Sequence, residues 1–130
     1  MNRERKVFCR VSIGELVDKI TILRLKTQNI SDPEKVLLAQ KEKEALEQSL
    51  SELNLEGIEH WIEKLMDVNG QLWQIEDQIR EKEAQKSFDK EFVELARSVY
   101  LTNDKRFALK SQINQDFGSE MSEVKSYQKY

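Results

Sequence analysis

Two successive stretches of helical periodicity, between residues 58 and 117, constrain the fold more than any other feature of this sequence. In the first, apolar residues alternate at spacings of three and four: Ile58, Trp61, Leu65, Val68, Leu72, Ile75 and Ile79. The second stretch carries a similar stripe: Phe92, Leu95, Val99, Leu109 and Ile113. Such a stripe holds one face of a helix against a partner helix. The sequence therefore predicts an antiparallel hairpin of two long helices, with residues 72–114 as its organising element.

Polar residues flank both apolar stripes, on faces that the hairpin would bury. On the first helix they are Asn69, Glu76, Arg80 and Glu83. On the second they are Tyr100, Asn103, Lys110 and Asn114, while Thr102 and Arg106 interrupt the stripe itself. Each polar group buried without a partner costs a few kcal/mol. Two interpretations remain open: an internal ion-pair network, or a polar pocket for an anionic or sugar-like ligand.

Composition supports an all-α fold. Charged residues make up 35% of the 130 residues, whereas there are only 4 glycines and 1 proline. Few helix breakers among many helix formers predict a bundle of three or four long helices in a single domain, residues 1–130. The formal net charge of −3 gives no electrostatic footprint for nucleic acid or for an anionic membrane, so we expect neither as a partner.

The sequence offers few residues for metal, redox or cofactor chemistry. Cys9 is the single cysteine and His60 the single histidine, which together cannot make a Cys/His zinc site or an internal disulfide. No glycine-rich nucleotide loop is present, and no apolar run reaches the roughly 18 residues that a membrane span needs. We expect a cytoplasmic protein with no cofactor, no metal and no catalytic residue.

The N-terminal half predicts two further helices. Residues 1–11 form an extended arm or, from Lys6 to Val11, a short strand. Ser12 and Glu15 have the spacing of a capping box and start a helix that is apolar on most sides, so we place this helix at the centre of the bundle or at a subunit interface. Ser31 and Glu34 start the next helix, with its inward positions at Val36, Leu37, Leu46, Leu50 and Leu53.

Local signals set the remaining boundaries. The third helix continues through Gly70, with a kink as an alternative. Ser87 caps the fourth helix, and Gly118 lies just after its end. The tail, residues 119–130, carries a further helical turn and docks on the bundle.

Four segments of the sequence resemble an uncharacterised bacterial family, a domain of unknown function: SIGELVDKITIL, LWQIEDQIR, FVELARSVYLTNDKRFALKSQIN and EVKSYQKY. The resemblance implies a small helical protein linked to cell-surface polysaccharide or glycosyltransferase systems, with a glycosyltransferase-type protein as partner. It implies no established activity. The family's motif-rich positions fall here on Glu76, Asp77, Arg80, Arg97, Tyr100, Asn103, Asp104, Lys110, Lys125 and Tyr127.

These observations define a candidate polar cluster for ligand binding: Glu76, Arg80, Arg97, Tyr100, Asn103, Asp104, Arg106, Lys110, Lys125 and Tyr127. We expect a homodimeric, non-enzymatic binding or scaffolding module. The alternative is a small all-helical enzyme or ligand-binding protein that uses this cluster as an Arg/Lys-rich pocket. A pocket predicts that the cations converge on a cavity. A scaffold predicts that they are paired with carboxylates: Arg80 with Glu76, and Arg97 with Asp104 or Glu123.

Overall fold

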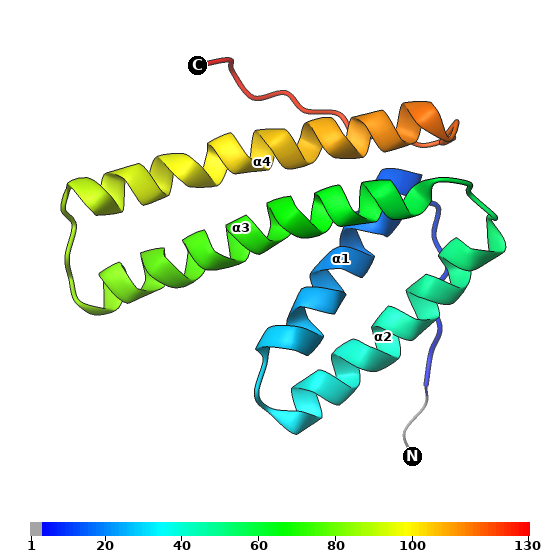
Figure 1. Cartoon of the computed structure of the whole chain (residues 1–130), viewed down its shortest axis with the longest axis horizontal. Coiled ribbons are helices and arrows are strands. Elements are labelled where there is room, and N and C mark those ends of the chain that lie inside the picture. The colour runs from blue at the N-terminus through cyan, green and yellow to red at the C-terminus, as the bar shows by residue number, and fades with distance from the viewer. Residues whose placement is uncertain (1–3) are drawn as a thin grey trace.

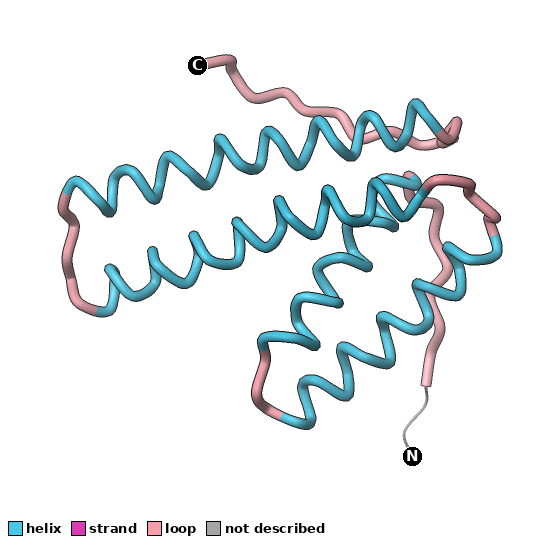
Figure 2. The backbone as a smooth tube through the Cα atoms, in the orientation of Figure 1, coloured by secondary structure: helices cyan, strands magenta, loops and turns pink. Residues whose placement is uncertain are grey.

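The computed structural model describes residues 4–130, and the protein is all-α, as the sequence predicts. Its four helices are α1 (Ile13–Asn29), α2 (Pro33–Glu52), α3 (Ile58–Ala84) and α4 (Lys90–Asp116). No strand occurs in residues 4–130 (Figure 2). No helix in this part of the chain is long and apolar enough to cross a membrane.

The four helices form two antiparallel hairpins that meet at an angle (Figure 1). Helix α1 packs against each of the other three helices, whereas α2 packs against α1 alone. The prediction that the first helix lies at the centre is therefore confirmed. The α3–α4 hairpin is present as predicted, but α1 is the element on which the other helices assemble.

The hydrophobic core lies where α1 crosses α3 and α4. Its fully or almost fully buried members are Val17, Ile20, Leu50, Ile58, Ile62, Leu65 and Ile113. We call the region formed by residues 12–21, 65–69 and 106–114 the junction. By contrast, no residue between 70 and 101 is buried. We call residues 70–101 the distal hairpin, which projects beyond α1 and α2 (Figure 1).

Side-chain caps begin three of the helices. The Glu15 N–H donates to the Ser12 hydroxyl at 3.0 Å, so the predicted cap of α1 is confirmed. The caps predicted for α2 and α4 are wrong by one and two residues. Asp32 caps α2, because proline in the first helical position pre-sets the backbone and places the cap directly before it. Asp89 caps α4 by accepting from the N–H of Phe92.

Other local predictions have mixed outcomes. Helix α3 runs through Gly70 without a break, and Gly118 follows the C-cap residue of α4 with φ of 63°. The Ser119 N–H reaches back to the Asn114 carbonyl at 2.9 Å, which closes that helix end. The prediction that Leu37 and Leu53 face inward is wrong. Both are exposed, because α2 packs on α1 alone.

Neither residues 4–11 nor the tail from residue 119 carries helix or strand. Residues 4–11 form neither helix nor strand and are exposed, so the alternative of a strand from Lys6 is wrong. The part of the predicted arm at residues 1–3 lies outside the described residues. The tail from residue 119 is extended and runs back along α4, with no helical turn (Figures 1 and 2).

Candidate functional site

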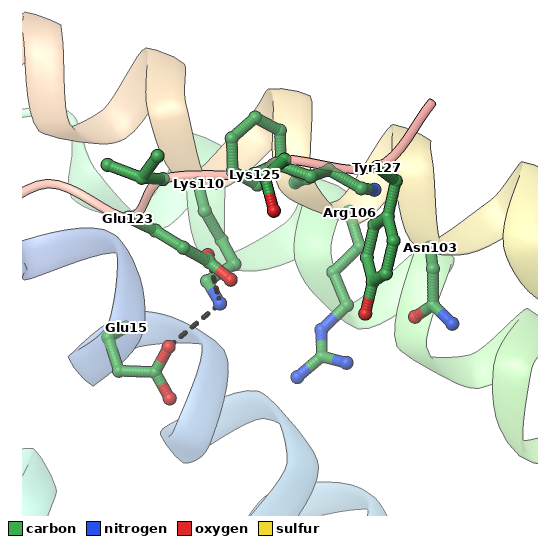
Figure 3. Close-up of a pocket in the computed structure, with 10 residues that line it drawn as sticks. Glu15, Asn103, Arg106, Lys110, Glu123, Lys125 and Tyr127 are labelled. Carbon is green, nitrogen blue, oxygen red and sulfur yellow. Dashed lines mark ion pairs between the residues drawn. The ribbon is translucent and has the colours of Figure 1, made fainter. Parts of the chain in front are cut away.

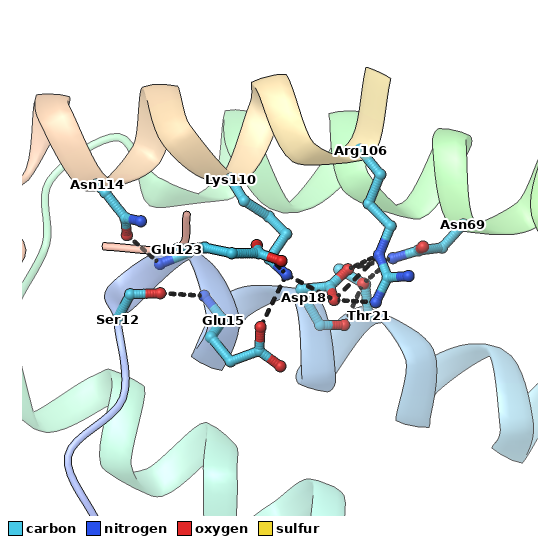
Figure 4. Close-up of polar contacts among 10 residues, drawn as sticks. Ser12, Glu15, Asp18, Thr21, Asn69, Arg106, Lys110, Asn114 and Glu123 are labelled. Atoms are coloured by element: carbon cyan, nitrogen blue, oxygen red, sulfur yellow. Dashed lines mark hydrogen bonds and ion pairs between the residues drawn. The ribbon is translucent and has the colours of Figure 1, made fainter. Parts of the chain in front are cut away.

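A fully buried carboxylate, Asp18, lies at the centre of the junction (Figure 4). Asn69 on α3 donates to Asp18 Oδ1 at 2.8 Å and to the Thr21 hydroxyl at 2.8 Å. Arg106 on α4 donates through Nε at 2.9 and 3.1 Å and also through Nη2. These donors compensate the cost of burying the charge, which would otherwise be several kcal/mol. The hydrogen bonds that Arg106 donates to Asp18 in turn raise the pKa of Arg106 above its ordinary value.

A second buried cation, Lys110, lies one helical turn further along α4. Its Nζ lies 2.8 Å from Glu15 of α1, 2.8 Å from Glu123 of the tail, and 3.8 Å from Asp18. Burial alone would lower the pKa of Lys110, but the two short carboxylate contacts and the charge of Asp18 raise it overall. Lys110 therefore joins α1, α4 and the tail through one ammonium group.

The start of α1 is fixed to the end of α4 by close backbone contact. The Gly14 N–H donates to Asn114 Oδ1 at 2.7 Å, and the Ile13 N–H donates to the Ser119 hydroxyl at 3.1 Å. A Cβ on Gly14 would lie 2.5 Å from the Lys110 carbonyl oxygen, so only glycine permits this approach. The contact sets the position of Glu15 and Asp18 relative to α4.

A cavity of about 540 Å³ opens beside Lys110, between α4, the start of α1 and the tail (Figure 3). Residues from the helices that line it are Glu15, Asn103, Arg106, Phe107 and Lys110. Residues 123–127 of the tail line another side. A second cavity, of about 410 Å³, has a mostly apolar lining that includes Leu72 and Trp73. Asn103 and Arg106 line both cavities.

Ion pairs, hydrogen bonds and one aromatic contact attach the tail to α4; the ring centroids of Tyr100 and Tyr130 lie 5.1 Å apart. Lys125 and Tyr130 both donate to the carboxylate of Asp104. The hydrogen bond from Lys125, followed by that from Tyr130, lowers the pKa of Asp104. The apolar tail side chains remain in solvent: Val124 is 88% exposed and Tyr127 84%. The tail is therefore held mainly by polar contacts.

The structure brings together half of the predicted cluster around the larger cavity. These five residues are Asn103, Arg106, Lys110, Lys125 and Tyr127. Asp104 lies beside them through its contact with Lys125, and Glu76 lines the second cavity. Both expected arrangements are present: these cations line a cavity, as a pocket predicts, and they are paired with carboxylates, as a scaffold predicts.

Arg80, Arg97 and Tyr100 do not line either of these cavities, although the ring of Tyr100 contacts that of Tyr130 in the tail, with 5.1 Å between ring centroids. Arg80 pairs with Glu76 as expected, at 3.7 Å, but its side chain is 79% exposed. Arg97 does not pair with Asp104 or Glu123: its Nε donates to the Tyr100 hydroxyl at 3.4 Å. That expectation is wrong because Lys125 and Lys110 already hold those two carboxylates.

The candidate cluster omitted Asp18 and Glu15, the two carboxylates of α1 that organise the junction. A signal was present in the sequence. Asp18 lies between Val17 and Ile20 on a helix that is apolar on most sides, so its side chain had few directions left that reach solvent. Among residues 4–130, no group of three His, Cys, Asp or Glu side chains is placed to hold a metal ion.

Comparison with known proteins identifies the family. No curated protein and no solved structure matches the chain significantly. A family model described as "Family of unknown function (DUF6165)" matches residues 7–130, which include all four helices and the tail. The chain therefore belongs to this family of unknown function, DUF6165.

Proposed function

We propose that the protein is a non-enzymatic helical binding and scaffolding module that acts as a homodimer, and that two copies pair through the distal hairpin. The observation that carries this proposal is that the apolar stripe continues through residues 70–101 while none of these residues is buried. Helix α1 covers the α3–α4 pair only at the junction. The distal stripe is thus covered by a single partner helix.

A second copy would complete the packing of this segment. Two antiparallel hairpins that face each other make a four-helix bundle, in which each stripe is covered from two sides. Several large apolar side chains of the distal hairpin are open to solvent, among them Phe88 at 57%, Val93 at 53% and Leu101 at 40%. A second copy that packs on the distal hairpin would remove these apolar side chains from water, which is favourable.

The charge pattern of the candidate cluster supports binding rather than catalysis. Arg106 is paired with Asp18, Lys110 with Glu15 and Glu123, and Lys125 with Asp104. These pairs stabilise the packing of α1 and the tail on α4. A dimer paired through the distal hairpin would present two copies of the junction to a protein partner, and the family resemblance suggests a sugar-transferring enzyme for that role.

Light scattering at micromolar concentration tests the assembly. We expect the wild-type protein to give twice the chain mass of 15.4 kDa. The variants Val93→Glu and Leu101→Glu place charge on the proposed interface and should give the monomer mass with unchanged helicity. Leu37→Glu, on the exposed face of α2, is the matched control and should remain dimeric. A folded wild-type monomer, or a control that dissociates equally, would contradict the proposal.

A further inference from the structure

We propose that Lys110 and the unpaired edge of Arg106 form a binding site for a small carboxylate-bearing molecule, and that Glu123 of the protein's own tail occupies this site. The site lies in the 540 Å³ cavity at the junction (Figure 3). It is separate from the distal surface proposed for pairing two copies, so each proposal can fail alone.

Glu123 behaves as a ligand rather than as part of the helical core. Its carboxylate lies 2.8 Å from Lys110 Nζ, yet its side chain is 43% exposed and comes from an extended segment. The next residue, Val124, is 88% exposed and adds little packing. Lys110 itself is almost fully buried, with its side chain 6% exposed. The buried ammonium of Lys110 therefore binds a carboxylate that belongs to the tail and not to the helices.

Arg106 supplies a second, oriented group for the same ligand. Asp18 engages Nε and Nη2 of the guanidinium and thereby fixes its plane. Within the described residues no hydrogen bond uses Nη1, and Arg106 lines the cavity. A planar guanidinium offers its N–H donors in a rigid fork that matches a carboxylate. Figure 4 shows the third nitrogen of the guanidinium on the side away from Lys110, so it can meet only the far end of a ligand whose carboxylate lies at Lys110.

The dimensions of the cavity suit a small ligand, and Glu123 marks where one carboxylate can lie. Its volume falls within the roughly 300–1,000 Å³ typical of ligand pockets. The charged lining consists of three cations (Arg106, Lys110 and Lys125) and two carboxylates (Glu15 and Glu123). A free carboxylate that replaces Glu123 leaves the charge around Lys110 unchanged, and the amide of Asn103 offers a further hydrogen bond.

The tail sets how tightly an external ligand can bind. A group tethered by a short flexible segment competes at an effective concentration on the order of millimolar. A free carboxylate must match this concentration to displace Glu123. Removal of the Glu123 charge removes the competitor and leaves the two cations in place.

The test uses the full chain and glutarate, a small dicarboxylate, at constant ionic strength. Binding is followed by the NMR shifts of the Asn103 side-chain amide and the Lys110 ammonium. We expect Glu123→Gln to bind glutarate about tenfold more tightly than the wild type, since the tethered competitor is lost. The matched control is Glu120→Gln, which removes the same charge from a tail carboxylate that pairs with Arg10 at the surface. This control should bind as the wild type does.

Further variants make the assignment specific. Lys110→Gln in the Glu123→Gln background should abolish glutarate binding. If that protein does not fold, Asn103→Ala in the same background leaves every ion pair intact and should weaken binding. Glutaramide, the neutral analogue, should bind none of the proteins. The proposal is overturned if Glu123→Gln shows no saturable shift, if Glu120→Gln gains as much as Glu123→Gln, or if glutaramide binds equally well. Mass by light scattering should be the same for Glu123→Gln and wild type, whatever that mass is.

Discussion

The junction and the distal hairpin use the same sequence pattern, an apolar stripe with polar neighbours, and reach opposite results. Asn69 and Glu76 are seven residues apart on one face of α3. Asn69 is 4% exposed and donates to Asp18, whereas Glu76 is exposed and contacts only Arg80 of its own helix. What differs is α1, which covers α3 at Asn69 and then diverges from it (Figure 1). The third helix, rather than the spacing, decides which polar residues need buried partners.

The sharpest test of this comparison removes the buried carboxylate. Asp18→Ala leaves Arg106 without its partner and takes one of three carboxylates from Lys110. Breaking one side of a buried ion pair costs about 3–5 kcal/mol. We expect denaturant unfolding to show a loss of this size. The same change at Asp77, an exposed acid of the distal hairpin, should have little effect. Equal losses at the two positions would mean that the regions do not differ in this way.

Two glycines give a second contrast, of smaller size and opposite sign. Gly14→Ala forces a methyl group to 2.5 Å from the Lys110 carbonyl oxygen, so α1 and α4 must separate. Overpacking of this kind costs about 1–3 kcal/mol. Gly70→Ala meets nothing within 4 Å and lies inside α3, where alanine stabilises a helix by up to about 1 kcal/mol. Thermal unfolding should therefore shift down for the first variant and up for the second. A Gly14→Ala protein as stable as the wild type would disprove the tight contact.

Periodicity alone predicts the helices, because the apolar residues of each stripe recur with the turn of the helix that carries them. It predicts α3 and α4, and it predicts that α3 continues unbroken through Gly70. It does not predict which polar side chains meet, because Asp18 and Arg106 are brought together by the crossing of helices that are distant in sequence. The assignment of Asp104 and Glu123 to Arg97 fails for this reason: the tail turns back at Gly118 and delivers Lys125 to Asp104 and Glu123 to Lys110. Amino-acid composition does not predict that the tail turns back along α4.

Acid pH should affect the distal hairpin through its turn. Contacts from Lys82, and then from the Phe92 N–H, lower the pKa of Asp89 from 3.8 to about 2. A carboxyl group whose pKa is lowered by folding adds stability above its unfolded pKa and loses it as the pH falls through the folded pKa. Asp89→Asn keeps a good cap but removes the charge. The stability advantage of wild type over Asp89→Asn should thus shrink between pH 3.8 and about 2 in denaturant unfolding. A difference that stays constant with pH would contradict this cause.

The smallest loss of stability is expected when Arg80 is removed. A small loss there would distinguish the distal hairpin from the junction. Arg80 and Glu76 have the spacing of a helical ion pair, but their side chains are 79% and 50% exposed and the contact is long, at 3.7 Å. Such a pair is screened by water and salt, and exposed pairs contribute under about 1 kcal/mol. Arg80→Ala should therefore unfold within this margin of the wild type. The comparison variant is Lys43→Ala, which removes an i,i+4 partner from Glu47 on α2; that pair is less exposed, at 20% and 35%, so its loss should cost at least as much. A loss at Arg80 of the size expected for Asp18 would show that a further element covers the distal hairpin in solution. In that case, the loss should depend on protein concentration if a second copy is the cover.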